Sequence, residues 1–326
     1  MAASYRSIDY SLRPGKYAER RMISEAVGKI HPFGAVKSYR YIGMGSLWFS
    51  DFSHFHKTLG IVDMISIERE AAHRPRFEFN KPLACIQLIF EDTAIALPAL
   101  DWTVRAIAWL DYDDRLTKSM LEDARVIASK ASPGSVFIIS IQVEGPPVFT
   151  ALDEDGEETV REVTSVQELR DNFGAGPVPA EALDSDLRGW ANAKLVRQMV
   201  KSAINAALAA RNVGRPNDQK IEFEQFAAFE YADGAKMTTI CGIFVDSGQK
   251  NLLSSCGFNQ LSFYKSNDEA TRLIVPILTP REMRMLETRL PGGVSPALGG
   301  NIVPGRDAEA FANLYRYLPS FASLEG

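Results

Sequence analysis

Carboxylates follow three successive apolar runs in the first third of the chain. Glu68 ends "MISIE", Asp92 follows "QLIF" with Glu91 as its alternate, and Asp111 ends "AIAWL". If these runs are parallel strands, their carboxyl ends meet at one edge of a sheet, where open α/β sheets bind ligands. The three acids are therefore expected to lie around one ligand site.

A glycine turn precedes these acids. The segment "YIGMGSLW" places Gly43 and Gly45 directly after a β-rich run, with Ser46 in the same turn. A pyrophosphate site needs a third glycine for close packing of helix on strand, and here that place holds Leu47 or Trp48. The pattern thus disfavours a dinucleotide and favours a ligand without phosphate.

A second group of acids surrounds the end of the fourth apolar run. In "AIAWLDYDDRL", Asp111 is a candidate base that accepts a proton from a hydroxyl. Asp111 and Asp113 could instead hold Mg²⁺ together, which would acidify such a hydroxyl. A third interpretation is that Asp113 and Asp114 cap a helix beginning near Arg115.

The elements that would position these residues alternate in type. Short runs rich in Ile, Val, Phe and Tyr predict parallel strands, with helical segments between them. The first helical segment, 47–60, has Trp48, Phe52, Phe55 and Leu59 at helical spacing and ends at Gly60. The predicted strands are 37–43, 62–68, 84–90, 105–112 and 135–144.

Beyond residue 144 the pattern changes. An acidic insertion is predicted over 145–182, containing a short helix capped by Ser165 with Glu168 three residues on and stopped at Gly174. A long helix should start at Asp184 or Ser185 and end near 211–214.

Two further features follow the long helix. Asp233-Gly234 predicts a tight turn between strands 221–231 and 236–245. In the tail, 251–326, Thr279 should cap a helix with Pro280 at its first position and Glu282 closing a capping box.

This element order resembles the class I S-adenosylmethionine (SAM) dependent methyltransferases over roughly 37–247. The resemblance implies an α/β fold: a Rossmann-like, seven-stranded, mostly parallel sheet ending in an antiparallel hairpin, with the insertion and a helical C-terminal extension. It divides the chain into a helical and basic segment 1–36, a methyltransferase domain 37–250 and the extension 251–326.

The resemblance also implies roles for residues. Glu68 would accept hydrogen bonds from both ribose hydroxyls of SAM, and Asp92 would meet the adenine amino group. The cofactor-binding residues would be Gly43, Gly45, Ser46, Glu68, Asp92 and Thr93.

Two departures from the family pattern affect the prediction. The acid that normally stands two residues before the first glycine is Tyr41 here, so the ammonium of SAM needs another partner, and Asp51 and Glu19 are candidates. No Asn/Asp-Pro-Pro motif follows the fourth strand. Its absence makes an amide or a nucleobase amine a less favoured acceptor, and a hydroxyl a more favoured one. The predicted catalytic residues are Asp111, Tyr112 and Asp113.

Charge argues against a dedicated nucleic-acid binder, because the net charge is −5. Residues 1–50 nevertheless carry eight Lys and Arg against three acids, whereas 150–190 carry eleven acids against three Arg. For the basic segment, which includes Lys16 and Arg20, we expect a helix packed on the sheet rather than a nucleic-acid surface. Without an apolar run of about 20 residues or a secretory leader, a cytoplasmic location is expected.

Two functional hypotheses follow. The first is a SAM-dependent methyltransferase, in which the insertion and the extension form the substrate side. The sequence does not specify the methyl acceptor. The second is an inactive methyltransferase-like scaffold that binds a protein or nucleic-acid partner, since a fold alone does not establish an activity.

Overall fold

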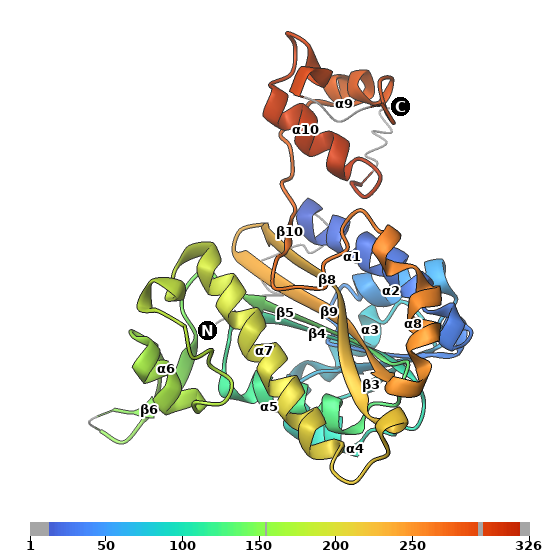
Figure 1. The fold of residues 1–326 in the computed structure, drawn as a ribbon. Helices are drawn as coiled ribbons and strands as arrows, with labels where there is room; N and C mark the ends of the chain where they lie inside the picture. Colours follow the sequence, from blue (N-terminus) through green and yellow to red (C-terminus); the bar gives the residue numbers. More distant parts are fainter. Residues whose placement is uncertain (1–12, 154, 293–295, 320–326) are drawn as a thin grey trace.

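The structure, a computed structural model, describes residues 13–153, 155–292 and 296–319. Over these residues one central sheet has eight strands in the order β10-β8-β9-β5-β4-β1-β2-β3 (Figure 1). β9 is antiparallel to β5 and β8, and the other neighbouring pairs are parallel. The strands are β1 (Arg40–Gly43), β2 (Asp63–Ile67), β3 (Ile86–Ile89), β4 (Ala106–Arg115), β5 (Val136–Gln142), β8 (Ile221–Ala232), β9 (Lys236–Asp246) and β10 (Thr271–Arg272). The predicted fold class is confirmed, and β10 adds an edge strand that the sequence did not indicate.

Helices cover both faces of this sheet. Successive side chains of a strand point to opposite faces, so Ile107 and Trp109 of β4 join one apolar core while Ala108 and Leu110 join the other. The first face is covered by α1 (Pro14–Gly28), α2 (Ser50–Leu59), α3 (Arg74–Asn80) and α8 (Lys250–Cys256), and the second by α4 (Thr93–Ala99), α5 (Lys118–Lys130) and α7 (Gly189–Arg211). Burial on both faces explains why the strands are almost continuously apolar.

The helix after β1 is shorter than predicted. Phe52 and Phe55 are buried and Gly60 ends α2 in the left-handed conformation with φ +71°, as expected. Trp48, however, precedes the helix and is 47% exposed, so it is not part of the buried stripe. Its neighbour Phe49 is fully buried, with φ +45°, and takes that place.

The insertion contains a hairpin that the sequence did not reveal. β6 (Val148–Leu152) and β7 (Glu158–Glu162) form an antiparallel pair, and the acidic run lies at their turn. The helix that follows is as predicted: α6 (Val166–Phe173) starts with Ser165 Oγ accepting from the Glu168 amide. Glu168 does not complete a capping box, because its carboxylate accepts from the amide and hydroxyl of Thr164.

The long helix begins later than predicted. Residues Asp184–Leu187 form a short 3₁₀ helix, and α7 starts at Gly189. Asp184 does not cap α7. Its carboxylate accepts from the amide of Val166, the first residue of α6, at 2.7 Å. None of the described helices, α7 included, is long and apolar enough to cross a membrane.

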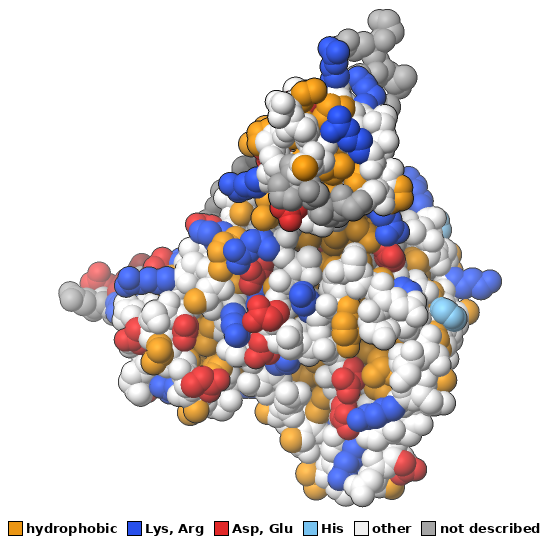
Figure 2. Space-filling model, turned by 45° about the horizontal axis from the view of Figure 1, so that its top comes forward, with side chains coloured by type: hydrophobic (Ala, Val, Ile, Leu, Met, Phe, Trp, Pro, Cys, Tyr) orange, Lys and Arg blue, Asp and Glu red, His pale blue; other side chains and the backbone are white. Residues whose placement is uncertain are grey.

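The C-terminal helices form a small module beside the sheet. Figures 1 and 2 show it projecting from the main body. α9 (Pro280–Glu287) begins with the predicted capping box, in which Thr279 and Glu282 bond each other's backbone amides. The module has its own apolar cluster, formed with α10 (Gly305–Leu314) from Leu286, Val303, Ala308 and Phe311.

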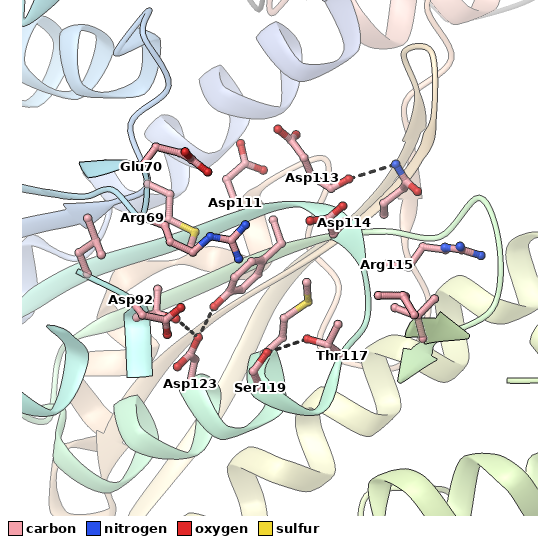
Figure 3. A pocket seen from close by; sticks show the side chains of 18 of the residues that line it. Arg69, Glu70, Asp92, Asp111, Asp113, Asp114, Arg115, Thr117, Ser119 and Asp123 are labelled. Carbon is pink, nitrogen blue, oxygen red and sulfur yellow. Dashed lines mark hydrogen bonds between the residues drawn. The ribbon is translucent and has the colours of Figure 1, made fainter. Parts of the chain in front are cut away.

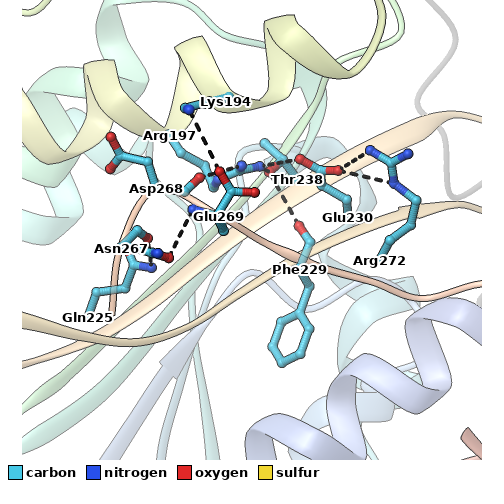
Figure 4. Close-up of polar contacts among 10 residues, drawn as sticks. All are labelled: Lys194, Arg197, Gln225, Phe229, Glu230, Thr238, Asn267, Asp268, Glu269 and Arg272. Atoms are coloured by element: carbon cyan, nitrogen blue, oxygen red, sulfur yellow. Dashed lines mark hydrogen bonds and ion pairs between the residues drawn. The ribbon is translucent and has the colours of Figure 1, made fainter. Parts of the chain in front are cut away.

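A buried ion network fastens α7 to the edge of the sheet (Figure 4). Arg197 donates to Glu230 at 2.8 Å and to Thr238 at 2.7 Å, and Arg272 approaches the other Glu230 oxygen at 2.6 Å. The Arg197 and Glu230 side chains are only 4% and 7% exposed. Replacing Arg197 would leave the buried Glu230 carboxylate with Arg272 alone. It would also remove the donor to Thr238 and to the Asp268 carbonyl, which is costly.

We therefore expect Arg197→Met to lower the free energy of unfolding by about 2–4 kcal/mol, because buried hydrogen bonds of a charged group are lost while Arg272 still pairs with Glu230. The matched control is Lys194→Met on the same helix, because Lys194 is 48% exposed and approaches Glu269 only to 3.8 Å. That change should cost no more than about 1 kcal/mol. Urea denaturation measures both, and equal losses would show that burial of the network is unimportant.

Candidate active site

A cavity of about 1000 Å³ opens where β1 to β5 end (Figure 3). The β6–β7 hairpin contributes Val148, Val160 and Glu162 to its wall. Gly43 and Ser46 belong to the β1 turn but are not among the lining residues. Those predicted site residues that do line it are Gly45, Glu68, Asp92, Thr93, Asp111, Tyr112 and Asp113.

The glycines of the β1 turn make room for polar groups of the protein itself. A Cβ at Gly45 would lie 2.9 Å from Glu68 Oε1 and closer still to Ser66 Oγ, and one at Gly43 would lie 2.9 Å from the Tyr41 hydroxyl. The Gly45 amide donates to Ser66 Oγ, which donates to Glu68 Oε1 at 2.7 Å. This chain of hydrogen bonds holds Glu68 against the turn.

Glu68 is a buried carboxyl group at the wall of the cavity. It is 7% exposed, and burial raises its pKa to about 8, against the opposing effect of the Ser66 hydroxyl. Glu68 is therefore largely protonated at neutral pH in the protein alone. A ligand that donates hydrogen bonds to the carboxylate, or that is itself cationic, would favour the ionised form.

The end of β3 is organised by two acids. Asp92 Oδ1 caps α4 by accepting from the Ala94 amide at 2.9 Å. Thr93 donates to Asp123 of α5 at 2.6 Å, and the Tyr112 hydroxyl donates to the same oxygen. Burial raises the pKa of the Asp123 carboxyl group. Asp123 is not among the site residues predicted from the sequence. The signal was present, because Asp123 interrupts the buried stripe formed in α5 by Met120, Ala124 and Ile127.

The helix cap predicted at Asp113 and Asp114 is wrong. β4 continues through Arg115, past a bulge, and α5 begins at Lys118 with Thr117 in the cap position. The extension is held from both sides: Gln142 donates to the Asp113 carbonyl, and Arg115 forms an ion pair with Glu162 of the hairpin at 2.6 Å. Among the described residues, no three His, Cys, Asp or Glu side chains converge as a metal site.

Asp111 and Tyr112, predicted to act together, point to opposite faces of β4. Figure 3 shows the Asp111 and Asp123 side chains on opposite sides of β4. The Tyr112 hydroxyl donates to Asp123 of α5 on one face of the sheet, whereas Asp111 contacts Lys16 of α1 on the other. There Lys16 Nζ lies 2.6 Å from Asp111 Oδ1 and 3.0 Å from Glu19 Oε2. Lys16 is 3% exposed, so α1 does pack on the sheet and this lysine is not part of a basic surface.

Tyr41 acquires a carboxylate from the next helix. Its hydroxyl donates to Asp51, which stands in the first turn of α2. Asp51 thus lies beside the β1 turn in the region where the usual acid is missing, whereas Glu19 lies with Lys16 and accepts from Thr239. Of the two candidates for the missing acid, the structure brings Asp51 to Tyr41.

Comparison with protein families gives a match over nearly the whole chain. A family described as "Putative O-methyltransferase" matches residues 8–326. The chain belongs to this family. In this methyltransferase family member, the antiparallel β9 between β5 and β8 also reproduces the sheet order expected of a class I methyltransferase.

No curated protein matches the chain. Among solved structures, a SAM-dependent methyltransferase from Mesorhizobium loti is 13% identical, with TM-score 0.35, over 64% of this chain and 92% of that one. The Methanococcus jannaschii fibrillarin pre-rRNA processing protein is 10% identical, with TM-score 0.36, over 64% and 67%. The glycopeptide N-methyltransferase MtfA in complex with S-adenosylhomocysteine is 14% identical, with TM-score 0.34, over 69% and 88%. These values are too low to transfer a residue role to this methyltransferase.

We expect Gly45→Ala to destabilise the protein by about 1–3 kcal/mol, because the added methyl group overpacks the contact with Ser66 and Glu68. Gly176→Ala is the matched control, since a Cβ there meets nothing within 4 Å. Adding Ser66→Ala to Gly45→Ala should cost less than the sum of the single changes, because it removes Ser66 Oγ, the closest of the atoms that the new methyl group would meet. If the losses in free energy of unfolding, measured by urea denaturation, were strictly additive, this explanation for a glycine at position 45 would be wrong.

Proposed function

We propose that the protein is a SAM-dependent methyltransferase, which binds SAM where β1 to β4 end and methylates a hydroxyl-bearing acceptor. The observation that carries the proposal is Glu68, held by Ser66 against the Gly45 turn inside the cavity. Its position at the end of the strand next to β1 suits a carboxylate that receives two ribose hydroxyls. Family membership supports methyl transfer as the reaction.

The charge of the cavity favours SAM over a dinucleotide. Its lining includes two cations, Arg69 and Arg115, and Arg115 is already paired with Glu162. A pyrophosphate would be repelled by this surplus of acids, whereas the sulfonium of SAM is cationic. The acids of the lining are Glu68, Glu70, Glu91, Asp92, Asp111, Asp113, Asp114, Asp123, Glu144 and Glu162.

Two further residues, Asp92 and Asp51, are assigned to the cofactor, and Thr93 supports the first of them. Asp92 uses Oδ1 to cap α4, so Oδ2 is left to accept from the adenine amino group. Thr93, whose hydroxyl is committed to Asp123, fixes the start of α4 instead of meeting the ligand through that oxygen. For the ammonium of SAM we assign Asp51, because the Tyr41 hydroxyl that binds it stands next to Gly43.

SAM supplies a methyl group activated on a sulfonium. The protein then has to align the acceptor and remove its proton. Asp111 is the carboxylate best placed for the second task, because it stands in the cavity wall just before the bulge of β4, with its side chain 26% exposed. The β6–β7 hairpin, anchored to β4 through Arg115 and Glu162, forms the acceptor side.

Glu68→Ala should weaken SAM binding by about 2–4 kcal/mol at pH 8.5, roughly 30- to 800-fold, through loss of two charge-assisted hydrogen bonds. Since burial places the Glu68 pKa at about 8, wild-type affinity should also rise as the pH increases from about 6 to about 8, by at most about tenfold per pH unit. Glu68→Gln should lack that part of the pH dependence. Calorimetry at several pH values measures both effects.

Glu70→Gln is the matched control, because Glu70 lines the same cavity without the Ser66 contact. Its SAM affinity should depend on pH as that of the wild type does, with a small loss of affinity that is the same at every pH. Unchanged affinity in Glu68→Ala would remove Glu68 from the cofactor site. A wild-type protein that fails to bind SAM at any pH would favour the scaffold hypothesis.

A further inference from the structure

Helix α1 delivers an ammonium group to the end of β4. Pro14 suits the first position of the helix, and the carboxylate of Asp233, in the β8–β9 turn, accepts from the Lys16 amide at 2.9 Å. A carboxylate at a helix N-terminus is favoured by the exposed amides and the helix dipole. This contact fixes the start of α1 and brings the Lys16 side chain onto Asp111 and over the Trp109 ring, 4.6 Å from its centroid.

The cluster contains one ammonium and two carboxyl groups. Lys16 approaches both Asp111 and Glu19, and Glu19 is fully buried and accepts from Thr239. Burial raises the pKa of Glu19, while the two carboxylates raise that of Lys16 against the effect of its own burial. Of the two contacts that the Lys16 ammonium makes, the one with Asp111 is the shorter, at 2.6 Å against 3.0 Å for Glu19.

We propose that Lys16 is a positioning residue of the methyl-transfer site: it holds Oδ1 of Asp111, so that Oδ2 is presented to the cavity as an ionised acceptor. This role rests on the proposed function. Asp111 lines the cavity, and among the described residues no hydrogen bond to its Oδ2 competes with a ligand. The class of acceptor that fits is a group that brings a proton to a carboxylate, a hydroxyl or an ammonium.

Other titratable groups around Asp111 do not replace Lys16. Two further cations lie in the region: Arg20 of α1, whose charge acts on Tyr41 and Asp51, and Arg69, which lines the same cavity. Among the described residues, however, only Lys16 forms an ion pair with Asp111. The remaining groups are acidic, so they cannot act as a counter-ion and would repel a charged Asp111 if the ammonium were removed. They come from α1, β1, α2 and β8, and are Glu19, Tyr41, Asp51 and Tyr231.

The test uses two SAM analogues. Sinefungin carries a primary amine where SAM carries the transferable methyl group, and S-adenosylhomocysteine carries nothing there. The ratio of their dissociation constants, measured by calorimetry between pH 5 and pH 8, isolates the contact at Asp111 because the other cofactor contacts cancel. In the wild type we expect a preference for sinefungin of about tenfold, as for one charge-assisted hydrogen bond. This preference should persist to the acid end of the range.

In Lys16→Gln, the pH below which the preference is lost should rise by at least one unit, because Asp111 no longer has its cation. Lys16→Arg, which keeps the charge, should retain the preference toward acid pH. Asp111→Asn should lose it at every pH. The double variant Lys16→Gln/Glu19→Gln removes both members of the buried Lys16–Glu19 pair, so it guards against failure of the single variant to fold, and it should behave as Lys16→Gln does.

The outcomes separate the two proposals. Variants that bind S-adenosylhomocysteine normally and keep the wild-type preference at all pH values would overturn the role of Lys16 and leave the proposed function intact. Failure of the wild type to bind either analogue would overturn the proposed function, and the role of Lys16 with it. The assignment would be supported if the pH below which the preference for sinefungin is lost rises in both variants that carry Lys16→Gln and does not rise in Lys16→Arg.

Discussion

The covering of both faces of the central sheet is the constraint on which the rest of the structure depends. With apolar cores on each side, β1 to β5 can present polar groups to a ligand only where they end. The cavity lies at those ends, and its polar side chains come from the last residues of the strands, the segments that follow them, the helices beyond and the β6–β7 hairpin. Two of the buried polar residues on the α1 face, Ser140 and Thr239, hydrogen-bond each other at 2.8 Å, so they have a partner without a ligand.

Helix α1 is an exception to apolar coverage, because it buries charge against the sheet. Removing Lys16 and Glu19 from water is costly, and their mutual attraction offsets that cost only in part. An apolar helix of the same shape would cover the sheet at least as well. The charged version makes sense if the ammonium is needed at Asp111, which ties a segment remote in sequence to the chemistry of the site.

The parts of this structure that could be predicted from sequence are governed by local interactions. The Thr279 capping box, the Gly60 helix end and the Asp233-Gly234 turn each depend on residues within a few positions of one another, and all three formed as expected. The long apolar strands were equally visible, because burial on both faces leaves few polar interruptions.

The parts that could not be predicted depend on tertiary contacts. Lys16 and Asp111 are 95 residues apart, and no pattern in either segment indicates that they meet. β4 runs on through two aspartates, which strands normally exclude, because Gln142 and Glu162 hold its end. Trp48 fitted the helical stripe, yet the left-handed turn at Phe49 moved it to the surface.

The acid surplus in the cavity works against the stability of the protein alone and in favour of a cationic ligand. Burial keeps Glu68 and Asp123 from ionising readily, and the neighbouring acids repel one another. Figure 3 shows Arg69 among the acids that line the cavity. The other cation of the lining, Arg115, is already paired with Glu162. A ligand that carries positive charge into the cavity relieves the repulsion and allows Glu68 to ionise toward it. A ligand that binds only the folded state stabilises it by an amount that grows with the ligand concentration relative to its dissociation constant. A ligand that brings positive charge is therefore expected to stabilise the protein more than one that brings a phosphate.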